Sequence, residues 1–205
     1  MIFIKYILKG KTLTNTVIQN KFNFRGRNRN LPWFPRKGKR TDLAELFMEL
    51  GYREGVEIGT RQGVFAKVLC DSNPKLHLTC VDPWTAYYRI SQEDQDKRYL
   101  EALEMLKGLN VTIIKKPSME AVGTFKDRSL DFVYVDGDHD FDCAMMDIIY
   151  WMPKVRTEGI FAVHDYNPAA GADVVSAVNA YTRCHHIDPW YVTREMEPTA
   201  YWVVK

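Results

Sequence analysis

Short apolar runs alternate with longer amphipathic stretches from Thr41 to the end of the chain, and this order limits the possible folds more than any other feature. The run LDFVYVD is nearly all apolar, which is typical of a parallel strand covered on both faces. Other runs of strand length pass through Val56 and Ile58 and cover 76–82, 111–116 and 160–165. Apolar residues with helical spacing fall between them, so the order predicts an α/β fold with a doubly wound parallel sheet. We expect helices over 41–50, 92–107 and 172–182, with two more through Phe65, Val68 and Leu69 and through Ala144, Ile148 and Ile149.

The two ends of this region carry signals of their own. Thr41 can cap the first helix and Gly51 can end it. The closing stretch PWYVTREMEPTAYWVV reads as two strands joined by a turn at Glu197-Pro198. It therefore predicts an antiparallel hairpin at the carboxyl-terminal edge of the sheet.

The length of 205 residues suits one α/β domain. With 46% hydrophobic and 26% charged residues, the chain is not of the collagen-like, disordered or disulfide-scaffold class. No stretch reaches the ~20 apolar residues of a membrane span, and lysines interrupt the apolar start MIFIKYILKGK. The four cysteines form no C-x-x-C pair, which suits buried thiols in a reducing compartment. We expect a cytoplasmic protein.

Charge divides the chain into a basic amino-terminal arm, residues 1–40, and a domain over 41–205. Eleven of the 28 basic residues and none of the 26 acidic residues lie in the arm, which leaves 17 basic against 26 acidic side chains in the domain. The arm could attract phosphates, and its arginines interleaved with aromatic residues suit base stacking in a nucleic acid. Alternatively, it docks on its own acidic domain or is a mobile tail, with Trp33 and Phe34 as a hydrophobic clasp.

A glycine turn follows the first predicted strand. In Glu57-Ile58-Gly59-Thr60-Arg61-Gln62-Gly63, Gly59 allows a tight turn and Gly63 allows the next helix to approach closely. The turn and the helix start then offer backbone N–H groups to a ligand. A dinucleotide fingerprint would place its second glycine at Arg61, so NAD is the less favoured ligand.

Polar residues follow the other predicted strands as well. Because ligands of such sheets bind at the carboxyl ends of the strands, these residues are expected at one rim. Asp82 can accept the hydroxyls of a ribose or cap the next turn, and Trp84 beside it could stack on an adenine or anchor the loop. Ser118 comes after the third strand. The fourth strand delivers Asp136-Gly137-Asp138-His139, and the fifth delivers His164-Asp165-Tyr166.

These residues resemble a known family. The resemblance lies in five stretches: VEIGTRQGVFA, CVDPW, DFVYVDGDHDFDCAMMDI, WMPKVRTEGIFAVHDY and the closing WVVK. Through them, the chain from about Gly55 to Lys205 is similar to class I S-adenosylmethionine (SAM)-dependent methyltransferases, and within them to the methyltransferase-24 family. The resemblance implies a Rossmann-like seven-stranded sheet whose last strand is antiparallel. It also implies SAM as cofactor, lined by Glu57, Gly59, Thr60, Gly63, Asp82 and Ser118, with Asp136 beside its methionine part. The arm lies outside the resemblance, and Thr157-Glu158-Gly159 departs from the glycine pair of many relatives.

Methyl transfer to oxygen needs alignment and a base for the acceptor proton. His164 and His139 are the candidate bases, and each could instead be a histidine bonded to backbone. Asp136, His164 and Asp165 match the positions at which metal-dependent relatives hold a divalent ion. A histidine in that set suits manganese, iron or zinc better than magnesium, which leaves metal dependence open.

We expect O-methylation of a small hydroxylated acceptor such as a sugar. The first alternative is an RNA ribose or cap methyltransferase that holds RNA with the basic arm. The sequence lacks an N/D-P-P-Y/F/W motif and a Pro-Cys nucleophile, which disfavours base methylation of DNA. The second alternative is a cofactor-binding subunit without catalytic activity.

Overall fold

The protein has one seven-stranded sheet in a computed structural model that describes residues 13–24, 32–35, 38–167 and 173–205. The strand order is β3-β2-β1-β4-β5-β7-β6, with β7 antiparallel to both of its neighbours and the pairs from β3 to β5 parallel. The predicted α/β class, the doubly wound sheet and the antiparallel hairpin are confirmed. The strands are β1 (Glu54–Ile58), β2 (His77–Val81), β3 (Val111–Ile114), β4 (Leu130–Val135), β5 (Val155–Val163), β6 (Trp190–Val192) and β7 (Ala200–Val203).

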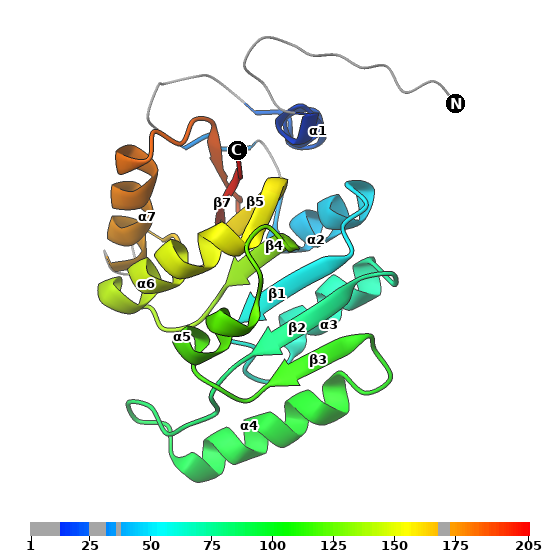
Figure 1. The fold of residues 1–205 in the computed structure, drawn as a ribbon, viewed down its shortest axis with the longest axis vertical. Helices are drawn as coiled ribbons and strands as arrows, with labels where there is room; N and C mark the ends of the chain where they lie inside the picture. The colour runs from blue at the N-terminus through cyan, green and yellow to red at the C-terminus, as the bar shows by residue number, and fades with distance from the viewer. Residues whose placement is uncertain (1–12, 25–31, 36–37, 168–172) are drawn as a thin grey trace.

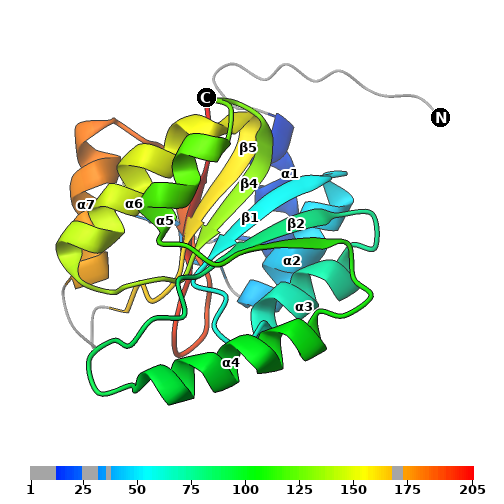
Figure 2. The same cartoon turned by 60° about the horizontal axis from the view of Figure 1, so that its bottom comes forward.

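Helices cover both faces of the sheet (Figures 1 and 2). Alternate residues of each strand point to opposite faces, so β4 sends Val133 and Val135 into one core and Phe132 and Tyr134 into the other. The first core is closed by α5, α6 and α7, and the second by α1, α2 and α3. The helices are α1 (Leu13–Phe22), α2 (Arg40–Glu49), α3 (Val64–Ser72), α4 (Gln92–Met105), α5 (Ser118–Ala121), α6 (Phe141–Trp151) and α7 (Asp173–Cys184).

The start of α2 differs slightly from the prediction. Thr41 lies inside the first turn, and Lys39 is the N-cap residue. The Lys39 backbone N–H donates to the Asp42 carboxylate at 2.7 Å, which satisfies one amide and starts the helix one residue early. Gly51 follows the end of the helix with φ +74°, as expected for a glycine stop.

Helix α1 packs on the same face of the sheet as α2 and α3, where sequence analysis predicts no helix. Ile18 and Phe22 are buried in the core that α2 and α3 share. At its amino-terminal end, the Thr14 backbone N–H donates to the Glu158 carboxylate at 3.0 Å. The Tyr191 hydroxyl of β6 donates to the Asn15 side chain at 2.7 Å. Helix α1 is therefore built into the domain from its first turn to its last.

A short segment after α1 extends the same contact. Trp33 forms an isolated parallel β-bridge with Tyr191 of β6. The Trp33 N–H donates to the Trp190 carbonyl at 2.8 Å, and the Trp33 carbonyl accepts from the Val192 N–H at 3.1 Å. The Phe24, Trp33 and Tyr191 rings stack edge-on or tilted against one another. Phe34 remains 57% exposed. The described parts of the arm thus cover the β6 edge of the sheet.

Only part of the charge of the arm can be placed. Lys21 pairs with Glu45 and Glu49 of α2, at 3.4 and 2.7 Å. Arg40 belongs to the pocket described below. The other basic residues predicted to attract phosphate lie outside the described residues, except Lys39, whose side chain is exposed. They are Lys5, Lys9, Lys11, Arg25, Arg27, Arg29, Arg36 and Lys37.

Two further features concern the helices and the cysteines. Within the described ranges, no helix combines the length and the apolar character needed to cross a bilayer. All four cysteines are free thiols.

Replacing Ile18 by Ala tests whether α1 is part of the folded domain. The side chain is completely buried, so its loss should lower the free energy of unfolding by about 2–4 kcal/mol. Leu13→Ala, in the same helix but at a side chain that is 69% exposed, is the control and should change stability by less than about 0.5 kcal/mol. Urea unfolding measures both, and equal stabilities of the two variants would contradict the packing of α1.

Candidate active site

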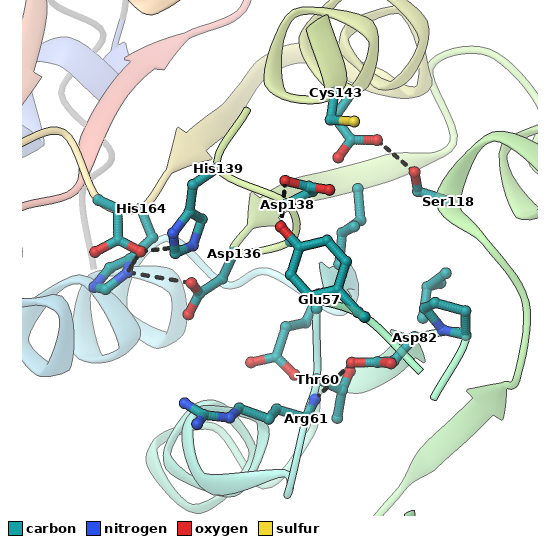
Figure 3. A pocket seen from close by; sticks show the side chains of 18 of the residues that line it. Glu57, Thr60, Arg61, Asp82, Ser118, Asp136, Asp138, His139, Cys143 and His164 are labelled. Atoms are coloured by element: carbon teal, nitrogen blue, oxygen red, sulfur yellow. Dashed lines mark hydrogen bonds and ion pairs between the residues drawn. The ribbon is translucent and has the colours of Figure 1, made fainter. Parts of the chain in front are cut away.

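A large pocket lies at the carboxyl ends of the parallel strands. Its volume is about 1240 Å³, above the range of roughly 300–1,000 Å³ that is common for one ligand. Side chains from the ends of β1, β2, β4 and β5 line it (Figure 3), joined by residues of α2 and of the β6–β7 turn. The pocket has room for two ligands side by side.

The glycine turn after β1 forms one wall. Gly59 has φ +85°, and a Cβ added there would collide with the backbone carbonyl of Asp136 at the end of β4. Gly63 has φ +81° and is the N-cap of α3, where its N–H closes the turn onto the Thr60 carbonyl at 2.8 Å. Both glycines are needed for conformations that side chains rarely adopt. The predicted turn is present and points the start of α3 at the pocket.

Glu57 is a buried carboxylate that forms no ion pair with any described residue. Its exposed fraction is 2%, and its Oε2 has no hydrogen-bond partner among the described residues. Burial raises its pKa to about 8, and the negative charge of Asp136 adds to the rise. Thr60 beside it is also buried, with an unpartnered hydroxyl. A buried carboxylate of this kind gains most from a ligand that brings a positive charge or N–H donors.

Asp82 lies in the pocket as predicted, whereas Trp84 does not. The carboxylate of Asp82 lines the pocket and accepts the backbone N–H of Arg61 and of Trp84, both at 2.8 Å, so it caps the loop. Burial raises its pKa. Trp84 is completely buried, donates its indole N–H to the Arg61 carbonyl at 2.7 Å and packs on Tyr99. Because its ring is enclosed and does not line the pocket, the expected stacking of Trp84 on adenine is not possible in this structure.

A second buried acid, Asp147, was missed by sequence reasoning. It comes from α6, lines the pocket and accepts a 2.6 Å hydrogen bond from the Ser118 hydroxyl. Burial raises its pKa to about 6. The sequence feature that could have identified Asp147 is its place as the only acid in the apolar stretch AMMDIIYW. Ser118 thus lines the pocket where it was expected, held by a carboxylate beneath it.

Tyr87 and Asp138 join two rims of the pocket. The Tyr87 hydroxyl, from the loop after β2, donates to the Asp138 carboxylate after β4 at 2.8 Å. Tyr87 is 41% exposed, so this contact lies at the mouth of the pocket. It ties the loop that carries Asp82 to the segment that carries His139.

The predicted histidines and acids after β4 and β5 come together, but in different environments. His139 is exposed over 60% of its side chain, and its Nε2 lies 2.9 Å from Asp165 Oδ2. Hydrogen bonding to Asp165 raises the pKa of His139. His164 is nearly completely buried, and its Nδ1 lies 3.2 Å from both Asp136 Oδ1 and Asp165 Oδ2. Figure 3 shows His139, His164 and Asp136 close together at one end of the pocket.

Arg40 occupies the far side of His164. Its Nη1 lies 3.3 Å from His164 Nε2 and 3.9 Å from Asp136 Oδ2. A guanidinium only donates, so this contact fits the tautomer in which Nε2 carries the lone pair and Nδ1 carries the proton, toward the two carboxylates. Both ring nitrogens of His164 therefore face protein groups, although Nδ1 forms no aligned hydrogen bond with either carboxylate, whereas His139 is open to the pocket. Arg40 had been assigned only to the basic arm, because nothing in its sequence context marks a site.

The residues predicted to hold a metal are adjacent, yet they do not form one converging set of ligand atoms. Within the described chain, the atoms that converge belong to Asp136, His139 and Asp165 in one group. The second group is His164, Asp165 and Glu197. The predicted set of Asp136, His164 and Asp165 does not fit a divalent ion, because Arg40 already faces His164 and Asp136. His139 was predicted as a base and not as a metal ligand. Glu197 was not predicted at all, because it reaches the pocket through the β6–β7 turn.

Replacing Glu57 by Gln tests the ionisation of this buried acid. The free carboxyl has a pKa of 4.5 and the folded one about 8, so the native state keeps a proton that the unfolded chain has lost. Stability should therefore fall as pH rises from about 4.5 to 8, and the variant, which cannot ionise, should escape this loss. We expect the melting temperature of Glu57→Gln to exceed that of the wild type by several degrees above pH 8 and to match it near pH 4.5.

Thermal melts across this pH range provide the measurement. Glu93→Gln removes an exposed acid from α4 and is the control, which should follow the wild type. Parallel curves for the wild type and Glu57→Gln would contradict the raised pKa.

Comparison with known proteins agrees with this geometry. No curated protein sequence matches the chain. Three similar solved structures are an O-methyltransferase from Bacillus cereus in complex with S-adenosylhomocysteine (SAH), the O-methyltransferase TomG from Streptomyces achromogenes in complex with SAM, and the SAH-bound methyltransferase PaMTH1 from Podospora anserina. Their sequence identities are 16%, 17% and 14%, and their TM-scores are 0.61, 0.55 and 0.60. The match covers 97%, 97% and 81% of this chain and 94%, 92% and 78% of the other chains.

The amino-acid sequence assigns the chain to a family. The model of the methyltransferase-24 family, a methyltransferase domain, matches residues 56–166, which is more than half of the chain. The matched region contains the glycine turn, Asp82, Ser118 and the residues after β4 and β5. The chain therefore belongs to the methyltransferase-24 family and is a SAM-dependent methyltransferase.

Proposed function

We propose that the enzyme transfers the methyl group of SAM to an oxygen atom of a small, uncharged, hydroxylated acceptor such as a sugar, with His139 as the general base. The observation that carries this proposal is the pair of His139 and Asp165 in the pocket that also contains Glu57 and the glycine turn. One part of the pocket suits the cofactor, and the part beside His139 suits the acceptor.

The cofactor part fits SAM by its chemistry. Glu57 offers an unpartnered buried carboxylate oxygen to the ammonium or sulfonium charge, and the start of α3 offers backbone N–H groups. Asp82 still has lone pairs for the ribose hydroxyls, since each of its oxygens accepts one backbone N–H. Ser118, held by Asp147, suits an adenine edge. When bound, SAM supplies a methyl group whose bond to sulfur breaks with the electron pair left on sulfur, as a bond to the acceptor oxygen forms.

His139 is better suited than His164 to take the acceptor proton. A general base needs a lone pair within reach of the substrate. If His139 donates its Nε2 proton to Asp165, its Nδ1 keeps the lone pair, and the exposed ring can meet an acceptor. His164 has both nitrogens engaged by Asp136, Asp165 and Arg40. We therefore assign His164 and Asp136 to positioning: Asp136 pairs with His164, His164 pairs with Asp165, and Asp165 in turn orients His139.

The charge of the pocket favours an uncharged acceptor over RNA. Nine acidic residues line it against three arginines, so a polyanion would meet repulsion at the point of transfer. The RNA alternative depends on the basic arm. Most of the basic residues of the arm lie outside the described ranges, and Lys21 is already paired with acids of α2. A small hydroxylated molecule meets neither obstacle.

Oxygen as the accepting atom has two sources of support. The solved proteins from Bacillus cereus and Streptomyces achromogenes are O-methyltransferases by name. A hydroxyl also needs removal of a proton during transfer, and the pair of His139 and Asp165 provides for that step. Expression in the cytoplasm, as the sequence predicts, would supply SAM and keep the thiols reduced.

Replacing His139 by Gln tests the proposed base. Turnover should fall by about 10²–10⁴-fold, while SAH affinity should stay within about twofold of the wild type, because His139 serves the acceptor rather than the cofactor. SAH release is measured with SAM and a panel of sugars, nucleosides and phenols, and SAH affinity is measured by calorimetry.

His186→Gln, an exposed histidine away from the pocket, is the control and should keep full activity. Full activity of His139→Gln would remove His139 from the reaction. SAH binding without turnover of any acceptor in the panel would instead favour the non-catalytic alternative.

A further inference from the structure

Arg40 reaches the acceptor part of the pocket from outside the family region, which begins at residue 56. It is the first residue of α2 and is fixed from two sides. Its backbone N–H donates to Glu195 Oε1 at 2.7 Å, and Glu195 also accepts from the Thr193 hydroxyl at 2.8 Å. The guanidinium carbon lies 5.2 Å from the centre of the Phe65 ring in α3. Arg40 is thus held by the β6–β7 turn and by an aromatic face, and one third of its side chain remains exposed.

The position of the guanidinium conflicts with a divalent ion bound by His164. If His164 Nε2 bound the ion, it would lose the 3.3 Å contact with Arg40 Nη1 and leave two cations side by side. If Nδ1 bound the ion, the ring proton would move to Nε2, where it would point at an arginine that can only donate. Asp136 Oδ2, 3.9 Å from Nη1, is already partly neutralised as well. Arg40 therefore disfavours a metal in both groups of converging ligand atoms, since one group includes His164 and the other includes Asp136.

We propose that Arg40 supplies in this enzyme the positive charge that a divalent ion supplies in metal-dependent relatives, so that it is a catalytic residue that holds the acceptor oxygen and stabilises its negative charge. This inference rests on the proposed function, because it assumes an oxygen acceptor beside His139. Both described polar contacts of the guanidinium involve one nitrogen, Nη1, and a guanidinium has five N–H donors. Arg40 therefore has donors left for an acceptor oxygen.

The assisted step needs no further reactant. The acceptor hydroxyl gives its proton to His139, and its oxygen forms a bond to the methyl carbon. The electron pair of the broken carbon–sulfur bond stays on sulfur, which becomes a neutral thioether. Arg40 donates to the oxygen throughout and is unchanged at the end. A fixed donor aimed at developing negative charge is among the strongest contributions that a site can make.

Binding of Mn²⁺ to Arg40→Met tests the inference without any acceptor. Methionine keeps much of the length and the packing on Phe65 but removes the charge, which frees His164 Nε2 and Asp136. We expect the variant to bind Mn²⁺ about tenfold more tightly than the wild type, or better, by electron paramagnetic resonance of the free ion. Arg40→Lys keeps the charge and should exclude Mn²⁺ as the wild type does. Lys39→Met removes a neighbouring exposed charge and should also behave as the wild type.

Several results would overturn the inference. Equal Mn²⁺ affinity of the wild type and Arg40→Met would show that Arg40 does not occupy the place of a metal. Arg40→Gln repeats the measurement if the methionine variant does not fold. Loss of SAH binding in a folded Arg40→Met variant would mark Arg40 as part of the cofactor site instead.

Activity gives a second readout with any acceptor that the panel identifies. Wild-type turnover should be unchanged by EDTA, whereas Arg40→Met should be slow and partly restored by Mn²⁺. Inhibition of the wild type by EDTA would contradict the inference. Absence of SAH binding or of turnover in the wild type would instead contradict the proposed function, so the two failures are distinguishable.

Discussion

The close approach of two chain segments, at Gly59 after β1 and at Asp136 after β4, determines the shape of the active site. No side chain fits between the Gly59 α-carbon and the Asp136 carbonyl, so the two strand ends meet backbone to backbone. This contact places the glycine turn beside the segment that carries Asp136 and His139. The cofactor part and the acceptor part of the pocket are neighbours because these two strands are neighbours in the sheet.

Electrostatics divides the pocket into the same two parts. In the part proposed for the cofactor, Glu57 is buried and forms no ion pair with a described residue, so the positive charge of SAM would stabilise its carboxylate. In the acceptor part, Asp136 and Asp165 share His164, and Arg40 closes the group from the other side. His139 stands at the edge of this group with Asp165 as its partner. The first part attracts a cation, and the second holds its own cation ready for an oxygen that becomes negative.

Most of the fold was predictable because strand burial and helical spacing are local patterns. The run LDFVYVD became β4, and the turn at Glu197-Pro198 joined β6 to β7. Strand ends at one rim then placed Glu57, Asp82, Ser118, Asp136 and His139 in one pocket. Helix α1 was not predictable from such patterns: its apolar residues are few, and it is stabilised by packing on β5 and β6 that only the folded chain provides.

The missed parts of the site share a cause. Arg40, Asp147 and Glu197 come from a helix start, a helix interior and a turn, so no strand-end rule applies to them. Trp84 was misplaced for a related reason. Its left-handed backbone, with φ +44°, turns the ring into the core, and nothing in the sequence marks that conformation.

A thermal melt of the wild-type protein with SAH, and in parallel with NAD, tests the central claim most directly. At about 100 times its dissociation constant, SAH should stabilise the fold by about 2.7 kcal/mol. For a chain of this size, this corresponds to a rise in melting temperature of roughly 5–10 °C, and NAD should give none. A rise with NAD but not with SAH would contradict the assignment of the glycine turn and of the buried Glu57 to SAM.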